Sequence, residues 1–187
     1  MKTLIFATGN KDKLKEASSI LPLKVSGIDL EIDEVQSSDL IYIAEKKVAE
    51  AFRKIKKPVF IDDVGVFFPA LKGFPGPYAK HFLDALGQEK ISTIIHGEKD
   101  KTIMISCVIA YHDGDKVHSF RGDVEGVTAQ KPKGKDGWAY DLIFIPDGYS
   151  KTYAELGSDV KNKISHRSLA LAKFKKFLDS EAKKKKV

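Results

Sequence analysis

Two adjacent aspartates, Asp62 and Asp63, directly follow the short apolar segment 59–61. Two carboxylates after a buried strand suit a hard cation, because Mg²⁺ takes one or two protein carboxylates together with phosphate oxygens. Neighbouring strand residues point to opposite faces, so only one of the two has to face a shared site. Glu34, in the acidic segment 31–39, is a candidate for a further ligand. The alternative is a turn or capping pair that binds no metal.

The segment 8–13, Thr-Gly-Asn-Lys-Asp-Lys, is a candidate phosphate site. It joins the apolar run 4–7 to a helix expected over residues 10–21. Gly9 permits a tight turn, and Asn10 is a favoured helix N-cap. A helix N-terminus with lysines beside it attracts an anion. An ordinary strand–turn–helix with surface lysines explains this segment equally well, and the full Walker pattern is absent, so the segment is not a P-loop.

Two stretches in the C-terminal part of the chain are candidates for contacts with a base. In segment 165–167, Ser-His-Arg, the serine suits a helix N-cap, and positive side chains in the first turn oppose the helix dipole. This unfavourable placement hints at a function, although exposed polar residues are the simpler explanation. In segment 137–141, Trp138 and Asp141 together can sandwich and hydrogen-bond a flat heterocycle. The alternative for these aromatic residues is core packing.

The hydrophobic pattern predicts strands and helices that alternate around these segments. Strands or apolar segments are expected at 4–7, 23–30, 59–61, 102–112, 116–127 and 138–145, and helices at 10–21, 40–56, 77–87, 88–96, 158–162 and 165–179. Residues 64–78 are rich in Gly and Pro and are expected to form a loop. Residues 113–115 are expected to form a hairpin turn, whose strands cannot easily be parallel. The sequence therefore predicts an α/β protein with a mixed sheet.

Helix 40–56 has one clear apolar face, and Ser38 or Asp39 is its expected N-cap. Its charged residues, including Lys47, are expected mostly off that face.

The totals fit one soluble, cytoplasmic domain or two intimate lobes, and no apolar run is long enough to span a membrane. The single cysteine, Cys107, lies in the apolar run 103–110 and is expected to be a buried core thiol. Of the net charge of +6, four charges belong to the lysines at 183–186, so the rest of the chain is nearly balanced. Nucleic acid is therefore not expected as the main partner.

Five motifs, in order along nearly the whole chain, resemble the inosine/xanthosine triphosphate pyrophosphatase family, whose members remove deaminated purine nucleotides. They are Thr8-Gly9-Asn10-x-x-Lys13, Phe60-Ile61-Asp62-Asp63, Gly73-Phe74-Pro75-Gly76-Pro77-Tyr78, Trp138 to Asp141, and Ser165-His166-Arg167. Each motif is weak alone, but five in the right order and spacing are highly specific.

The resemblance implies hydrolysis of ITP, dITP and XTP to the monophosphate and pyrophosphate, with Mg²⁺ or Mn²⁺. It implies a two-lobed α/β fold with an elongated mixed β-sheet flanked by helices and a cleft between the lobes. Family members are typically homodimers. We accordingly expect one two-lobed domain over residues 1–180, followed by a basic tail at 181–187.

The resemblance also implies roles for individual residues. Asp63 would bind metal together with Glu34 and act as general base, and Asp62 would support it or be a further ligand. The expected triphosphate contacts are Thr8, Gly9, Asn10, Lys11, Asp12, Lys13 and Lys161. Trp138, Tyr140 and Asp141 would frame the base, and Ser165, His166 and Arg167 would read its edge. Val64 and Ala139 are further expected substrate contacts. A 6-keto purine presents an acceptor where adenine presents a donor, so donors from His166 and Arg167 fit inosine and xanthine.

Three departures from the family pattern bear on these roles. Val64 stands where many members have Ser, and Ala139 where many have Gly. Segment 31–39 aligns loosely, so Glu31 or Asp33 can replace Glu34 as the ligand. The sequence does not show how GTP, also a 6-keto purine, is rejected. Two other functions stay open: a non-catalytic nucleotide- or RNA-binding protein, and an enzyme acting on a modified pyrimidine nucleotide.

Overall fold

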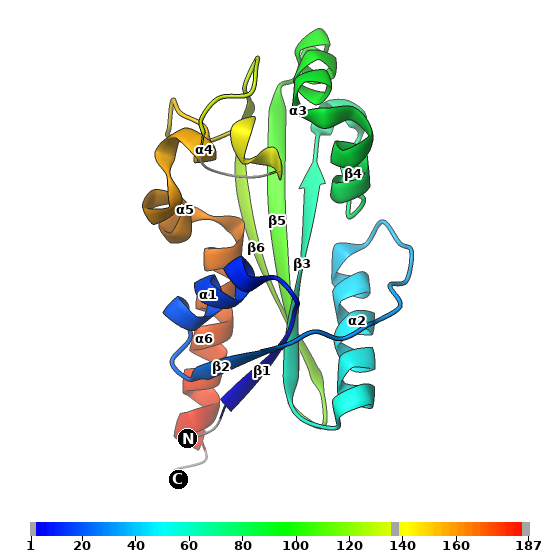
Figure 1. The fold of residues 1–187 in the computed structure, drawn as a ribbon, viewed down its shortest axis with the longest axis vertical. Helices are drawn as coiled ribbons and strands as arrows, with labels where there is room; N and C mark the ends of the chain where they lie inside the picture. Colours follow the sequence, from blue (N-terminus) through cyan, green and yellow to red (C-terminus); the bar gives the residue numbers. More distant parts are fainter. Residues whose placement is uncertain (1–2, 136–138, 185–187) are drawn as a thin grey trace. The chain divides into compact units, whose positions relative to one another are not determined.

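A computed structural model describes residues 3–135 and 139–184 of the chain (Figure 1). Its strands are β1 (Thr3–Ala7), β2 (Lys24–Ile28), β3 (Val59–Phe67), β4 (Pro75–Gly76), β5 (Thr102–His112), β6 (Val117–Thr128) and β7 (Phe144–Pro146). Its helices are α1 (Lys11–Ile20), α2 (Leu40–Ile55), α3 (Ala79–Gly97), α4 (Tyr153–Leu156), α5 (Ser158–Ile164) and α6 (His166–Lys184), with short 3-10 helices η1 (Pro69–Leu71) and η2 (Ala139–Leu142). No helix in these ranges is long and apolar enough to cross a membrane.

The strands form one open, mixed sheet in the order β2-β1-β3-β5-β6-β7, with β4 paired to β3. Strand β1 is parallel to both β2 and β3, whereas β4 is antiparallel to β3 and β7 is antiparallel to β6. Strands β5 and β6 are neighbours joined by residues 113–116. The predicted α/β fold with a mixed sheet and the predicted hairpin are therefore confirmed.

The chain divides into two compact units. Unit 1 comprises Met1–Asp63, Cys107–Gly122 and Arg167–Val187, and unit 2 comprises Val64–Ser106 and Asp123–His166. The unit boundaries fall within β3, β5 and β6, so each of these strands contributes residues to both units. Helix α6 continues to Lys184, so residues 181–184 of the expected tail are helical.

Unit 1 packs helices on both faces of its strands, with α2 on one face and α1 and α6 on the other (Figure 1). On the α2 face, Val59 and Ile61 of β3 belong to the same buried cluster as Val48 of α2. On the opposite face, Phe60 packs against Phe174 of α6, with ring centroids 5.3 Å apart. Because strand side chains alternate between faces, residues 62 and 63 continue this division.

Side-chain caps fix where the first two helices begin. The Asn10 side chain accepts hydrogen bonds from the backbone N–H groups of Asp12 and Lys13, at 2.9 and 3.0 Å. Asp39 caps α2 in the same way. Both predicted N-caps are confirmed, with Asp39 rather than Ser38 in that role.

The expectation that the aspartate pair ends its strand is wrong. Strand β3 continues through residues 64–67, which were expected to begin a loop, because Val66 and Phe67 pair antiparallel with β4. The pair nevertheless marks an edge in the sheet. Parallel β1 pairs Phe6 with Phe60 and ends at Ala7, so the parallel neighbour stops just before the level of the aspartates.

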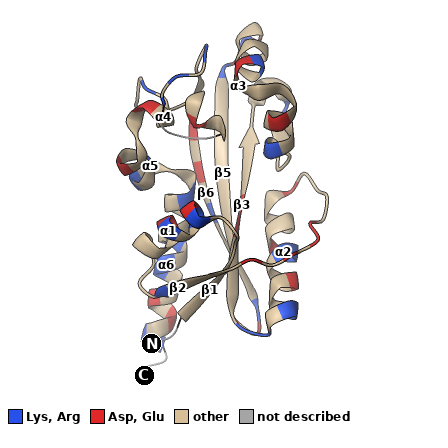
Figure 2. Ribbon diagram, in the orientation of Figure 1, with Lys and Arg blue, Asp and Glu red and all other residues tan. Residues whose placement is uncertain are grey.

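Figure 2 shows charged residues mainly on helices and connections, while the strands are mostly uncharged.

Unit 2 has its own core, and its helices differ from expectation in two places. Ile91 and Ile95 of α3 belong to the same buried cluster as Ile103 of β5. Helix α3 begins at Ala79 rather than at residue 77. Its backbone is non-helical at Gly87, so α3 consists of two helical segments that meet at a kink there, as predicted. The four-residue helix α4, which starts with a capping box, was not expected.

Candidate functional site

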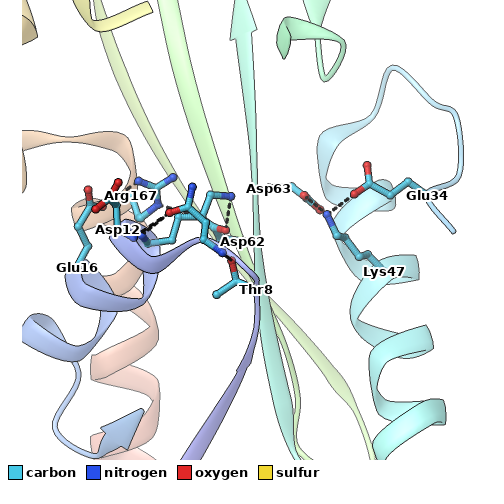
Figure 3. A network of polar contacts seen from close by, with 10 residues as sticks. Thr8, Asp12, Glu16, Glu34, Lys47, Asp62, Asp63 and Arg167 are labelled. Carbon is cyan, nitrogen blue, oxygen red and sulfur yellow. Dashed lines mark hydrogen bonds and ion pairs between the residues drawn. The ribbon is translucent and has the colours of Figure 1, made fainter. Parts of the chain in front are cut away.

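Asp62 lies at the centre of a buried network of ion pairs in unit 1 (Figure 3). Its Oδ1 accepts a hydrogen bond from Lys13 Nζ at 2.7 Å, and its Oδ2 accepts one from Arg167 Nε at 2.7 Å. Arg167 also donates from Nη1 to Glu16 Oε2 at 2.9 Å. The side chains of Asp62 and Arg167 are only 1% and 6% exposed, so the charges are balanced within the protein.

Helices α1 and α6 bring these partners to β3. Lys13, Glu16 and the buried Ala17 share one face of α1, since they are three and four residues apart. Arg167 is in the first turn of α6, where its charge opposes the helix dipole. Burial would raise the pKa of Asp62, but the charges and hydrogen bonds of Lys13 and Arg167 outweigh burial and hold the pKa well below its usual range. Asp62 therefore stays ionised and compensates the unfavourable placement of Arg167.

Asp63 points to the opposite face of β3, toward α2 (Figure 3). Its Oδ1 accepts a hydrogen bond from Lys47 Nζ at 2.8 Å, and the same ammonium donates to Glu34 Oε1. The other oxygen of Asp63, Oδ2, is buried and has no hydrogen-bond partner among the residues described. Burial raises the pKa of Asp63 to about 6, against the opposing effect of the Lys47 charge.

The Asp63 cluster has donors that fit a hard divalent cation. Asp63 and Glu34 each direct a carboxylate oxygen at the same cationic group, the Lys47 ammonium. The orphaned Oδ2 of Asp63 is a further oxygen donor without a partner in the described chain. Of the three acidic residues considered in segment 31–39, Glu34 is the one seen to share a cation with Asp63. Residues 3–135 and 139–184 contain no group of three or more His, Cys, Asp and Glu placed to hold a metal. The carboxylates seen at the Lys47 ammonium are those of Asp63 and Glu34.

Lys47 is the residue of this site that the sequence reasoning missed. It was expected off the apolar face of α2, yet it lies three residues after the buried Ala44 and four before the buried Ala51. It is therefore on the buried stripe, and its side chain is 19% exposed. A lysine on the buried face of a helix needs an acidic partner. Its spacing of three and four residues from Ala44 and Ala51 is therefore the sequence signal that could have identified Lys47.

The turn of residues 8–13 is held by its own side chains. Thr8 Oγ1 accepts a hydrogen bond from the Asn10 backbone N–H at 3.1 Å, and Asn10 in turn caps α1. A Cβ at Gly9 would lie 2.9 Å from the Asp29 carboxyl group, so the turn closely approaches that side chain. Lys13 Nζ reaches Asp62, while Lys11 is exposed. Because two of the first N–H groups of α1 bind Asn10, an anion there depends on other donors.

Unit 2 holds most of the residues expected near the base. Lys161 Nζ donates to Asp141 Oδ2 at 2.6 Å, and both side chains are largely buried. The Tyr140 hydroxyl donates to the Ala79 carbonyl at 2.8 Å, and its ring belongs to the core of the unit. Ala139 has a φ of 56°, in the left-handed region that favours glycine. Trp138 lies outside the described residues.

Three other predicted contacts also belong to unit 2. Val64 packs its side chain against the unit 2 core. Ser165 follows α5 and directly precedes α6, and its backbone N–H donates to the Lys161 carbonyl at 2.8 Å. His166 is the first residue of α6 and is 7% exposed.

Comparisons with known proteins agree with the motif resemblance. The sequence model of the Ham1 family matches residues 4–177. The dITP/XTP pyrophosphatase of Methanopyrus kandleri is 39% identical, over 91% of this chain and 93% of its own. The inosine triphosphate pyrophosphatase of Yarrowia lipolytica is 37% identical, over 98% of this chain and 100% of its own. The structure of a HAM1 protein from Coxiella burnetii matches with a TM-score of 0.87 and 28% identity, over 96% of this chain and 100% of that one.

Proposed function

Because the chain belongs to the Ham1 family, we propose that it hydrolyses non-canonical purine nucleoside triphosphates to the monophosphate and pyrophosphate. Its relatives named dITP/XTP pyrophosphatase and inosine triphosphate pyrophosphatase indicate dITP, XTP and ITP as substrates. The observation that carries the proposal is the buried Asp63 carboxylate. It has one oxygen without a partner among the residues described and a raised pKa, and it shares the Lys47 ammonium with Glu34. The chain is thus a nucleotide pyrophosphatase that removes deaminated purines.

In this proposal, Asp63 and Glu34 hold Mg²⁺ or Mn²⁺. The hard oxygen donors of both side chains suit these ions. A cation held there would supply charge neutralisation for the phosphates and would activate a water molecule.

Asp63 is also the proposed general base. Its Oδ2, which has no hydrogen-bond partner among the residues described, is the oxygen available to accept a proton. It takes a proton from water as the water oxygen bonds to the α-phosphorus. The bond from that phosphorus to the oxygen bridging the α- and β-phosphates breaks, and that oxygen leaves with pyrophosphate.

Lys13 and Arg167 are cationic hydrogen-bond donors in unit 1, and Asp62 positions both. Holding cations in place before the substrate arrives avoids reorganisation during the reaction. In unit 2, the Lys161 ammonium is similarly positioned by Asp141. We propose that Lys13 and Lys161 bind the triphosphate and that Asp141 and Arg167 contact the nucleoside.

A binding protein without turnover explains the site less well. A phosphate-binding surface gains nothing from two ionisable carboxylates on β3 unless a cation accompanies the anion. The homologous enzymes also match over almost their full lengths. From the composition and the motif resemblance to this family we infer that the protein works in the cytoplasm and assembles as a homodimer.

The test is pyrophosphate release from ITP, dITP, XTP, GTP, ATP and a modified pyrimidine triphosphate, with Mg²⁺. We expect rapid release from the first three, little from the others, and monophosphate as the nucleotide product. Release of orthophosphate, or no turnover by folded protein, would contradict the proposal. Preference for the pyrimidine would retain the enzyme class and change the substrate.

A further inference from the structure

We propose that Lys47 is a built-in counter-cation of Glu34 and Asp63 and that it sets how tightly these carboxylates bind a divalent cation. The inference rests on the proposed function, in which the two carboxylates hold the metal. Lys47 would then act before any substrate arrives. It would act on the cation through the two carboxylates that it contacts.

The inference rests on the contacts of one atom, Lys47 Nζ. Lys47 Nζ is 2.8 Å from Asp63 Oδ1 and also donates to Glu34 Oε1 (Figure 3). Both carboxylates therefore direct an oxygen at a single positive charge. A divalent cation needs oxygens of the same two groups, and it would also be repelled by an ammonium a few ångströms away. The ammonium and the cation thus compete for the site.

Burial makes Lys47 more effective than an ordinary surface lysine. The Lys47 side chain is 19% exposed and Asp63 is 14% exposed, so solvent screens their interaction little. The stem of Lys47 lies on the buried stripe of α2, between Ala44 and Ala51, and this keeps the ammonium near β3. Its charge is therefore a fixed property of the site.

A second lysine of α2 provides a matched comparison. Lys54 Nζ donates to the Glu31 carbonyl and so holds the same segment that carries Glu34. It binds a main-chain oxygen of that segment, whereas Lys47 binds the carboxylates of Glu34 and Asp63. If α2 lysines served only to position the segment, removing either would weaken cation binding. If Lys47 is a counter-cation, only its removal strengthens binding.

The experiment measures Mn²⁺ binding to the full, nucleotide-free chain by electron paramagnetic resonance of free Mn²⁺. We expect Lys47→Met to bind roughly tenfold tighter than wild type, because a nearby positive charge is removed. Lys47→Gln, which keeps a polar end, should show the same direction and guards against a folding defect in the Met variant. Lys46→Met removes an exposed charge next to Lys47, and Lys54→Met removes the other contact with the segment.

The two controls should each leave the affinity within about twofold of wild type. Unchanged or weaker binding in both Lys47 variants would overturn the inference, as would an equal gain in Lys46→Met. Failure of the proposed metal site is recognised separately by adding Asp63→Asn to Lys47→Met. If that double variant keeps the tighter binding, the cation is not at Asp63, and both the metal assignment and this inference are wrong.

Discussion

Asp62 and Asp63 are neighbours in sequence but have opposite electrostatic environments. Asp62 is surrounded by Lys13 and Arg167, whose charges outweigh the effect of burial and keep its pKa low. Asp63 has one cationic partner and a bare buried oxygen, so burial dominates and raises its pKa to about 6. One carboxylate is thus suited to holding cations in place and the other to accepting a proton. The alternation of β3 produces this division.

The first prediction concerns Asp62. Replacing Asp62 with Ala leaves the buried charges of Lys13 and Arg167 without their shared partner. We expect the free energy of unfolding to fall by about 3 kcal/mol or more, as is usual when one member of a buried ion pair is removed. Urea denaturation followed by circular dichroism measures this loss.

An exposed ion pair supplies the control for Asp62. Asp84 pairs with Lys80 at 2.8 Å on α3, and these side chains are 58% and 83% exposed. Asp84→Ala should cost less than about 1 kcal/mol, because solvent screens such pairs. If the two variants lose equal stability, the buried ion pairs of Asp62 contribute no more to folding than an exposed pair, which contradicts the prediction.

At the scale of elements, the sequence indicated most helices and strands but not the length of β3. Hydrophobic spacing and capping residues are local signals, so α2 and the caps Asn10 and Asp39 were predicted correctly. Residues 64–67 become a strand because β4, contributed from further along the chain, pairs with Val66 and Phe67. The Gly and Pro content of residues 64–78 indicated a loop, and no local signal reveals the pairing.

The candidate site was predictable to a similar extent. Motif resemblance indicated Lys13, Asp62, Asp63 and Arg167. The structure brings Lys13 and Arg167 to Asp62 on one face of β3 and leaves Asp63 on the other face, beside Lys47. Which of these residues form ion pairs could not be predicted from the sequence, because contacts between α1, β3 and α6 depend on the tertiary fold. Lys47 was missed for the same reason, since its acidic partners lie on other elements.

The second prediction concerns the hairpin between β5 and β6. Asp113 Oδ1 accepts hydrogen bonds from the backbone N–H groups of Asp115 and Lys116, both at 2.8 Å, and Oδ2 lies 2.8 Å from His118 Nε2. Partial burial opposes the charge of Asp113, but these contacts outweigh it and lower its pKa to about 2. The folded state therefore favours the ionised form.

A lowered pKa in the folded state contributes stability above the unfolded pKa, near 4, and the contribution disappears as pH falls through about 2. Asp113→Ala should thus reduce the free energy of unfolding by about 1 kcal/mol at pH 7. The difference between variant and wild type should shrink between pH 4 and pH 2. Parallel urea titrations at several pH values measure it, and a difference that stays constant over this range would refute the role of the Asp113 charge.

At the scale of the whole molecule, each unit has its own buried core, and the single cysteine is a buried residue of unit 1. Cys107 is fully buried, as predicted, and burial raises the pKa of its thiol. The third prediction is that Cys107 resists modification by a thiol reagent in the native protein and reacts completely in denaturant. Rapid modification under native conditions would mean that the unit 1 core opens readily.

The measurement that tests the whole account most directly is the turnover number for ITP with Mg²⁺ in Asp63→Asn and wild type. Asp33→Asn, which removes a charge from the acidic segment of Glu34, is the matched control, and circular dichroism verifies folding. If Asp63 both holds the cation and accepts the proton, its replacement should lower turnover by about 10³-fold, whereas the control should stay near wild type. Turnover of Asp63→Asn within about tenfold of wild type would contradict the central claim and place the base elsewhere, with Asp62 the first residue to examine.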